Sequence, residues 1–124
     1  LRASGLNDNA IVMNNSALVQ LKLGKKAQAV KFARAAVALT PDDPNVLDTL
    51  GWTLLKSSPD KVEALTLLRK ASSRAPGNLE IRWHLANALA ANGKAVEAKR
   101  VISSLKAFAS SDQQAKIDKL LARL

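Results

Sequence analysis

The sequence predicts an all-α protein, a right-handed α-solenoid of three helical hairpins followed by a C-terminal capping helix. Its composition favours helices over strands, because alanine and leucine are abundant and aromatic residues make up only 3% of the 124 residues. Apolar residues recur at helical spacing, as in NVLDTLGWTLLK at residues 45–56. Small residues and prolines also recur in phase with a period near 34 residues, which is typical of helical repeats that stack into a solenoid.

Small residues occupy two fixed places in every unit. A glycine inside a helix costs about 1 kcal/mol relative to alanine. Gly51, in the middle of a helix, therefore predicts that two paired helices approach closely there. Leu50 and Leu85 precede the small residue of their units, and we expect both to be buried. The small residues are Ala17, Gly51 and Ala86 in the first helices and Ala29, Ala64 and Ala98 in the second helices.

Breakers and capping residues place the helices in order. Gly24 and Gly93 separate the two helices of the first and third hairpins. Asp43 is suited to cap a helix that begins at Pro44, and SPD at 58–60 marks the start of the next one. The predicted helices cover residues 9–22, 25–39, 44–56, 59–74, 79–91, 94–108 and 112–123.

The chain is expected to begin and end with segments outside the hairpins. The N-terminal LRASGLNDN looks like the end of a preceding unit and its turn. The last helix follows SSDQQ, where Ser110 and Gln113 are placed to form a capping box, and its IDKLLARL looks like a solvating cap. The expected segments are 1–8 as the end of a preceding unit or a linker, 9–43, 44–77 and 78–109 as three repeats, and 110–124 as the capping helix.

The repeat pattern resembles the tetratricopeptide repeat family over residues 10–109. The sequence departs from the family at Gln20, Leu54 and Leu89, where tyrosine is common. The stretches PNVLDTLGW and GNLEIRWHLANALAANGK also resemble the C-terminal repeats of bacterial tetratricopeptide lipoproteins of exopolysaccharide and exosortase (PEP-CTERM) systems. The residues that carry the family resemblance are Ala17, Gly24, Ala29, Ala36, Pro41, Leu50, Gly51, Ala64, Ala71, Pro76, Leu85, Ala86, Gly93 and Ala98.

The resemblance implies a scaffold whose first helices line a concave groove for an extended peptide or a partner's helix. Both tryptophans project onto that face in neighbouring units, and tryptophan is the residue most enriched in binding hot spots. The sequence leaves open whether they are exposed in the groove or packed between hairpins. The expected partner-binding residues are Asn14, Leu18, Lys22, Asp48, Trp52, Lys56, Trp83, His84 and Asn87.

Two kinds of site are not expected. A clamp for a C-terminal carboxylate, as in chaperone-binding members of the family, needs basic residues where this sequence has Asn14, Thr49, Glu80 and His84. His84, the only histidine, has Glu80 one turn before it, which suits a weak ion pair. The sequence places no further metal ligand beside them, and no nucleophile, base and orienting group converge. We therefore expect no catalytic residue, cofactor or metal.

The net charge of +9 is carried mostly by the second helices and their turns. One interpretation is a solvated convex face. The other is attraction to an acidic partner, such as a protein, an anionic polysaccharide or a membrane surface. Nucleic acid is disfavoured because no aromatic stacking platform accompanies the charge. The basic residues concerned are Lys25, Lys26, Lys31, Arg34, Lys61, Arg69, Lys70, Arg74, Lys94, Lys99, Arg100 and Lys106.

Three functions are compatible with these patterns. The first is a non-catalytic scaffold that binds a peptide or helix in its groove, as part of a larger protein in a bacterial assembly or export system. The second is a structural segment of a longer solenoid, in which the repeats set spacing and the exposed ends stack on further units. The solenoid ends are also a candidate surface for self-association. The third is a basic module for an anionic polymer or a membrane surface. No apolar run approaches the roughly 18 residues of a membrane span. The compartment is periplasmic if the lipoprotein resemblance holds and otherwise cytoplasmic.

Overall fold

A computed structural model describes residues 4–124, with side chains from residue 8 onward. The described residues form seven α-helices and one short 3₁₀ helix and contain no strand, so the predicted all-α class is confirmed. The helices are α1 (Ser4–Lys22), α2 (Lys26–Leu39), α3 (Pro44–Ser57), α4 (Val62–Arg74), α5 (Leu79–Ala91), α6 (Ala95–Leu105), the 3₁₀ helix η1 (Lys106–Phe108) and α7 (Ser111–Ala122).

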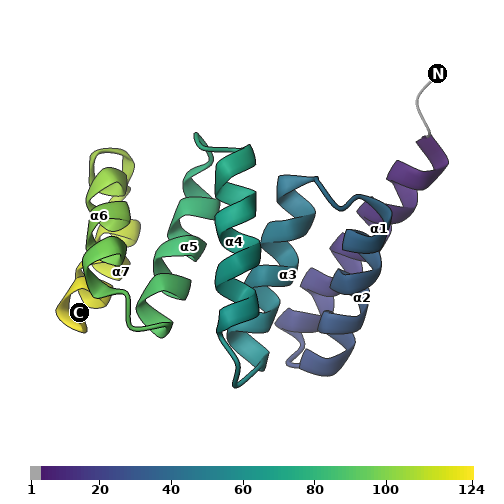
Figure 1. Cartoon of the computed structure of the whole chain (residues 1–124), viewed down its shortest axis with the longest axis horizontal. Coiled ribbons are helices and arrows are strands. Elements are labelled where there is room, and N and C mark those ends of the chain that lie inside the picture. The colour runs from purple at the N-terminus through teal and green to yellow at the C-terminus, as the bar shows by residue number, and fades with distance from the viewer. Residues whose placement is uncertain (1–3) are drawn as a thin grey trace.

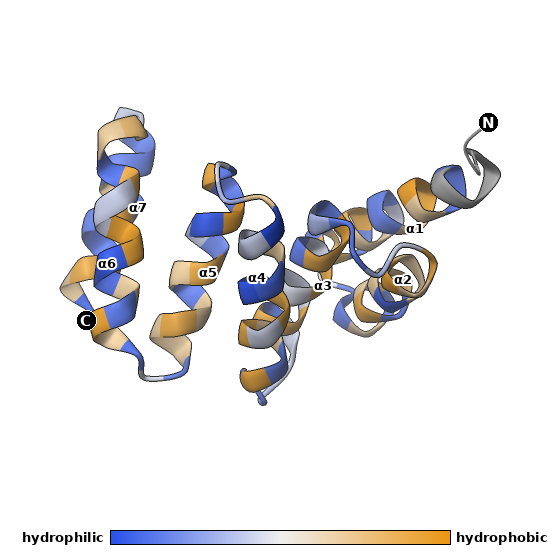
Figure 2. Cartoon of the chain, turned by 45° about the horizontal axis from the view of Figure 1, so that its top comes forward, coloured by the Kyte–Doolittle hydropathy of each residue, from blue (hydrophilic) through white to orange (hydrophobic). Residues whose placement is uncertain are grey.

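Consecutive helices pair into hairpins, α1 with α2, α3 with α4 and α5 with α6, and each hairpin packs on the next. Figure 1 shows the hairpins side by side in one row, with α1 and α2 at one end and α6 and α7 at the other. Figure 2 shows hydrophobic and hydrophilic residues on these helices, as expected of amphipathic helices that bury one side. The predicted α-solenoid of three hairpins with a final helix is therefore confirmed.

The first helix begins earlier than the sequence predicted. A helix was expected from residue 9, with residues 1–8 as the end of a preceding unit. Residues 1–3 lie outside the described residues, whereas residues 4–8 form the beginning of α1. No proline interrupts residues 4–22, so the helix continues upstream of the expected boundary.

The small residues of the repeat are buried where paired helices meet, as predicted. A Cβ atom added to Gly51 in α3 would lie 2.7 Å from Cγ of Leu68 and 3.3 Å from the carbonyl oxygen of Ala64, both in α4. Leu50 and Leu85 are buried as expected. The close approach of α3 and α4 therefore requires a residue without a side chain at position 51. The alanines at the other small-residue positions, Ala17, Ala29, Ala64, Ala86 and Ala98, are each 0% exposed.

Helix ends follow the predicted capping chemistry at several places. Asp43 caps α3 by accepting a hydrogen bond of 2.9 Å from the backbone N–H two residues further on. Ser110 and Gln113 form the predicted capping box at the start of α7. Gly24 and Gly93 have positive φ angles of 77° and 73°, a conformation that glycine adopts without strain, and so end α1 and α5 with tight turns.

The start of α4 differs from the prediction, which placed it at residue 59. Side-chain hydrogen bonds hold the preceding residues in a non-helical turn. Ser58 Oγ accepts from the backbone N–H of Asp60 at 3.2 Å, and Asp60 Oδ1 accepts from the backbone N–H of Val62 at 2.9 Å. Because these short polar side chains satisfy the backbone outside the helix, α4 begins only at Val62.

Two bidentate ion pairs join the second helices of successive hairpins. Arg34 in α2 donates to both carboxylate oxygens of Glu63 in α4, each at 2.9 Å, and Arg69 in α4 holds Glu97 in α6 in the same way. The two pairs occupy equivalent places in the repeat. The hydrogen bonds to arginine lower the pKa of each glutamate below its ordinary value of 4.5. They also raise the pKa of each arginine.

A third cluster of charges lies at the turn between α2 and α3. Asp42 forms ion pairs with Lys70 at 3.3 Å and with Arg74 at 3.2 Å, both in α4. Together with the two arginine pairs, this turn neutralises part of the basic face that the sequence assigned to the second helices. These contacts between hairpins were not predicted, because the sequence gives the face of a helix but not its distance from acidic groups in the next unit.

Candidate partner-binding groove

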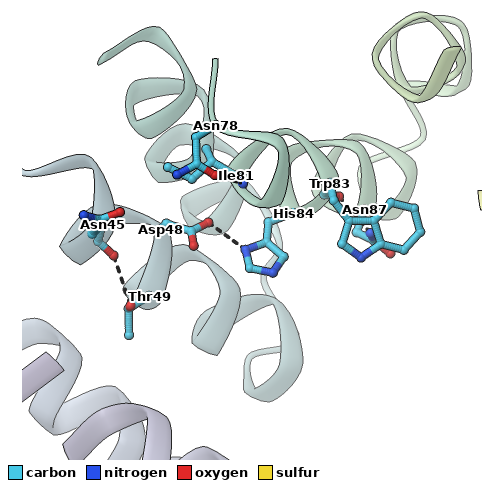
Figure 3. Close-up of polar contacts among 8 residues, drawn as sticks. All are labelled: Asn45, Asp48, Thr49, Asn78, Ile81, Trp83, His84 and Asn87. Carbon is cyan, nitrogen blue, oxygen red and sulfur yellow. Dashed lines mark hydrogen bonds and ion pairs between the residues drawn. The ribbon is translucent and has the colours of Figure 1, made fainter. Parts of the chain in front are cut away.

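Asp48 and His84 were expected to face a partner, but they are buried, with exposed fractions of 7% and 8%. Figure 3 shows that Asp48 in α3 and His84 in α5 point toward each other, and Oδ1 of Asp48 lies 2.7 Å from Nδ1 of His84. A carboxylate can only accept, so the hydrogen lies on Nδ1 of the imidazole. This bond joins the second and third hairpins, and it corrects the expectation that Glu80 is the partner of His84.

Trp52 lies directly against this pair. Its ring stacks on the imidazole of His84, with ring centroids 4.0 Å apart and planes at 17°. The ammonium nitrogen of Lys56, one turn further along α3, lies 4.3 Å from the centroid of the same ring, at a distance suited to a cation–π interaction. Trp52 is partly exposed. Its position is therefore fixed by neighbours on its own helix and on α5.

Trp83 is also partly exposed, and it packs against the C-terminal end of the solenoid. Its side chain contacts the buried cluster that includes Ile102 and Leu105 of α6 and Ile117 of α7. Asn87, one turn further along α5, donates to the carbonyl oxygen of Trp83 at 2.8 Å. Neither tryptophan is fully buried or fully exposed, so each combines a packed side with an accessible one.

Both tryptophans line one hollow of about 380 Å³, which we call the apolar hollow. Its far wall comes from η1, which was expected as the end of the helix at 94–108, and from α7, which was expected only as a solvating cap. An exposed phenylalanine just before the last helix was the available signal for this wall. The lining residues are Trp52, Leu79, Glu80, Trp83, His84, Leu105, Phe108, Ala109, Gln113, Lys116 and Ile117.

A second, shallower hollow of about 910 Å³ lies toward α1, and we call it the lysine hollow. It shares Trp52 and Glu80 with the apolar hollow, so the two are neighbours along the first helices. Four of its side chains belong to the expected partner-binding set, namely Leu18, Lys22, Trp52 and Lys56. The lining residues are Asn15, Leu18, Val19, Leu21, Lys22, Lys26, Trp52, Lys56 and Glu80.

Asn14 and Asn87, also expected in the groove, line neither hollow. The side-chain oxygen of Asn14 is buried and has no hydrogen-bond partner among the described residues. Asn14 stands at the repeat place of Asp48, and Thr49 stands at the place of His84. The hydroxyl of Thr49 donates instead to the carbonyl oxygen of Asn45 at 3.0 Å (Figure 3). The first and second hairpins therefore lack an equivalent of the Asp48–His84 bond.

Among the residues that the structure describes, one group of side chains in the groove could hold a metal ion. One ligand atom each from Asp48, Glu80 and His84 lies within 4.8 Å of the others. This cluster was not predicted from the sequence, because Asp48 comes from a different repeat. Nδ1 of His84 is already hydrogen-bonded to Asp48, and only Glu80 is exposed. Three ligands are one fewer than a structural zinc site uses.

Stacked helical hairpins with hollows along their first helices define a helical-repeat protein. The sequence profile of the tetratricopeptide repeat family matches residues 60–124, more than half of the chain. The chain belongs to the tetratricopeptide repeat family. Such repeats generally mediate protein–protein interactions and are typically non-catalytic scaffolds.

A solved structure supports the fold. A mutant of the O-GlcNAc transferase of Thermobaculum terrenum is similar to this chain, with a TM-score of 0.73 and 20% sequence identity. The match covers 79% of this chain and 19% of the transferase chain, so the two share a solenoid fold over a small part of the enzyme. No curated protein matches this sequence, and the lipoprotein resemblance stays a prediction. None of the described helices is long and apolar enough to cross a membrane.

Proposed function

We propose that the chain is a scaffold that holds a peptide or helix of a partner protein along α1, α3 and α5. The observation that carries this proposal is that Trp52 and Trp83, from successive hairpins, line one hollow. The resemblance of residues 44–52 and 77–94 to lipoprotein repeats supports a place within a larger tetratricopeptide repeat protein of a bacterial assembly or export system.

The tryptophans are suited to this role because their positions are fixed before a partner arrives. Trp52 is held between α3 and α5 by its contacts with His84 and Lys56, and Trp83 is held by the α6–α7 cluster. Binding to fixed side chains avoids the free-energy cost of ordering them, which is about 0.5–1.5 kcal/mol per side chain. Partly exposed aromatic side chains with one packed face are typical of interface hot spots.

Site-specific cross-linking tests the proposal. A photoreactive phenylalanine analogue is placed at Leu79, which lines the apolar hollow, and in a second protein at Thr66, which is exposed on α4. Each protein is incubated with extract of the source organism and illuminated. We expect a discrete cross-linked partner from position 79 and none from position 66. Equal yields of cross-linked partner from both positions would contradict binding in the groove. A yield from position 79 that does not fall when Trp52→Ala is added would contradict it as well.

The electrostatic alternative has less support. Arg34, Arg69, Lys70 and Arg74 on the second helices are engaged with acidic side chains of the chain itself. A face on which three of the four arginines are already paired offers fewer free cations to an anionic polymer or membrane. Binding that disappears at high salt and survives loss of both tryptophans would reverse this ranking.

A second candidate function is structural, with the solenoid stacking through α1 on another helical repeat. The observation that favours it is an apolar face on α1 and its turn, where Ile11, Val12, Val19 and Leu23 are more than half exposed, at 55%, 58%, 53% and 62%. Gln28 occupies the repeat position of Glu63 and Glu97, each of which accepts hydrogen bonds from an arginine of the preceding hairpin. Sedimentation velocity should then show dimers of this chain that a Val12→Glu/Leu23→Glu variant loses. A monomer at all concentrations would contradict end-to-end stacking.

A further inference from the structure

We infer that the groove binds a segment of a partner protein that carries a large apolar side chain and carboxylates. The apolar side chain enters the apolar hollow as an anchor, and the carboxylates lie on the side of this anchor that faces α1. This inference rests on the proposed function and adds the chemistry and direction of the bound segment. It predicts which peptides bind. It also assigns a binding role to Phe108, which lines only the apolar hollow, and to Lys22 and Lys26, which line only the lysine hollow.

The apolar hollow is built to receive one large apolar side chain. Phe108 and Leu79 are large apolar residues with exposed fractions of 65% and 39%, and both line this hollow. Trp83 and Ile117 supply packed apolar walls between them. A contiguous exposed apolar surface that includes a concave hollow is typical of an interaction site. The volume of about 380 Å³ is enough for an aromatic or leucine side chain together with adjacent backbone.

The lysine hollow has the opposite character. Lys22, Lys26 and Lys56 line it, and Glu80 at its border is the only acidic lining residue. Among the described residues, no ion pair joins these three lysines to an acidic side chain, in contrast to the paired arginines of the second helices. Their positive charge is therefore available for a partner. Carboxylates are the complementary groups that a protein segment supplies.

Glu80 contributes to the direction of the segment. It lines both hollows and is exposed, so a carboxylate placed beside it would be repelled. Three lysines line the hollow near α1, whereas Lys116 is the one lysine that lines the hollow near α5 and α7, so carboxylates of the segment are favoured near α1. A peptide with the same residues in reverse order would exchange the three lysines for Lys116 alone. The chain therefore distinguishes a sequence from its reversal.

Peptide selection tests this inference directly. A phage library of random dodecapeptides is selected on the whole chain, and the enriched peptides are synthesised and measured by titration calorimetry. We expect the enriched sequences to share an aromatic residue or leucine with aspartate or glutamate to one side of it. Reversing such a peptide should weaken binding at least tenfold.

Matched variants separate the two parts of the inference. Phe108→Ala should weaken every enriched peptide about tenfold, and Lys22→Glu/Lys26→Glu should weaken acidic peptides about tenfold or more and reduce the salt dependence of binding. Lys31→Glu/Lys99→Glu, which places the same charge change on exposed positions of α2 and α6, is the control and should have little effect. All of the altered side chains are exposed, and circular dichroism verifies folding.

The outcomes distinguish this inference from the proposed function. Enriched peptides without carboxylates, or acidic peptides unaffected by Lys22→Glu/Lys26→Glu, would overturn the inferred chemistry. The groove would still be the binding site if Phe108→Ala or Leu79→Ser weakened those peptides. Peptides that bind equally well to all of these variants, or no enrichment at all, would overturn both the inference and groove binding.

Discussion

Asp48 and His84, 36 positions apart in the chain, meet in a buried hydrogen bond of 2.7 Å that joins α3 to α5. Trp52 stacks on the imidazole of this pair, so the same contact that holds two hairpins together also fixes an aromatic side chain in the groove. Between the first and second hairpins the equivalent places hold Asn14 and Thr49, which share no hydrogen bond. The second and third hairpins therefore share a buried polar contact beside Trp52 that the first and second hairpins lack.

Replacing Asp48 with alanine should destabilise the chain and loosen Trp52. The change leaves the buried N–H of His84 without its acceptor, which costs about 1–3 kcal/mol in the free energy of unfolding. Asp48→Asn keeps an acceptor oxygen and should cost less. Urea unfolding followed by circular dichroism measures the stability. Asp118→Ala, at an exposed position, is the control. The prediction fails if Asp48→Ala is no less stable than Asp118→Ala.

Gly51→Ala should also be destabilising, although alanine is the better helix former. The helix propensity of alanine contributes about 1 kcal/mol, but the added methyl group would lie 2.7 Å from Cγ of the fully buried Leu68. Overpacking of a core typically costs about 1–3 kcal/mol, so we expect a net loss of about 1 kcal/mol. Gly77→Ala, in the turn before α5 where a new Cβ meets nothing within 4 Å, is the control for a methyl group added without overpacking. A stability gain in Gly51→Ala would show that α3 and α4 separate at little cost.

The fold was predictable because single residues at fixed positions of the repeat indicate how its helices pack. The in-phase alanines and Gly51 mark places where helices touch, and caps such as Asp43 mark where helices start. The start of α4 was missed because Ser58 and Asp60 satisfy the backbone outside a helix. That choice depends on local hydrogen bonds rather than on periodicity.

The site was only partly predictable. Helical phase places Trp52 and Lys56 on the face of the groove, and the structure finds both lining the lysine hollow. Phase does not give the distance to the next hairpin, so the burial of Asp48 and His84 and their mutual bond were missed. The wall formed by Phe108 was missed because η1 and α7 do not continue the repeat pattern, and their position depends on tertiary packing.

The Arg34–Glu63 pair should make stability depend on pH in the acidic range. The hydrogen bonds from Arg34 lower the pKa of Glu63 below 4.5 in the folded chain, so the carboxylate form is favoured by folding. The contribution is present above pH 4.5 and is lost as the pH falls through the lowered pKa. Both side chains are about half exposed, so the pair contributes no more than about 1 kcal/mol.

Arg34→Gln tests this contribution. The melting temperature of the variant should lie below that of the unaltered chain at pH 7, and the difference should shrink as the pH is lowered below 4.5. High salt should also reduce the difference, because exposed ion pairs are screened. Lys31→Gln on the same helix, whose side chain is exposed, is the control and should give a difference that does not change with pH. A constant difference for Arg34→Gln would mean that the arginine acts through packing alone.

Leu120→Ala should detach α7 and open the apolar hollow on one side. Leu120 is 3% exposed and packs with Ile102 and Leu105 of α6, so its truncation leaves a cavity that costs about 2–5 kcal/mol. Because α7 has few other contacts with the solenoid, we expect backbone amides of α7 to lose hydrogen-exchange protection before those of α3. Lys119→Ala, on the exposed side of α7, should leave protection unchanged. Uniform loss of protection along the chain would show instead that α7 and the hairpins unfold as one unit. The wall that α7 contributes to the apolar hollow would then be as stable as the hairpins.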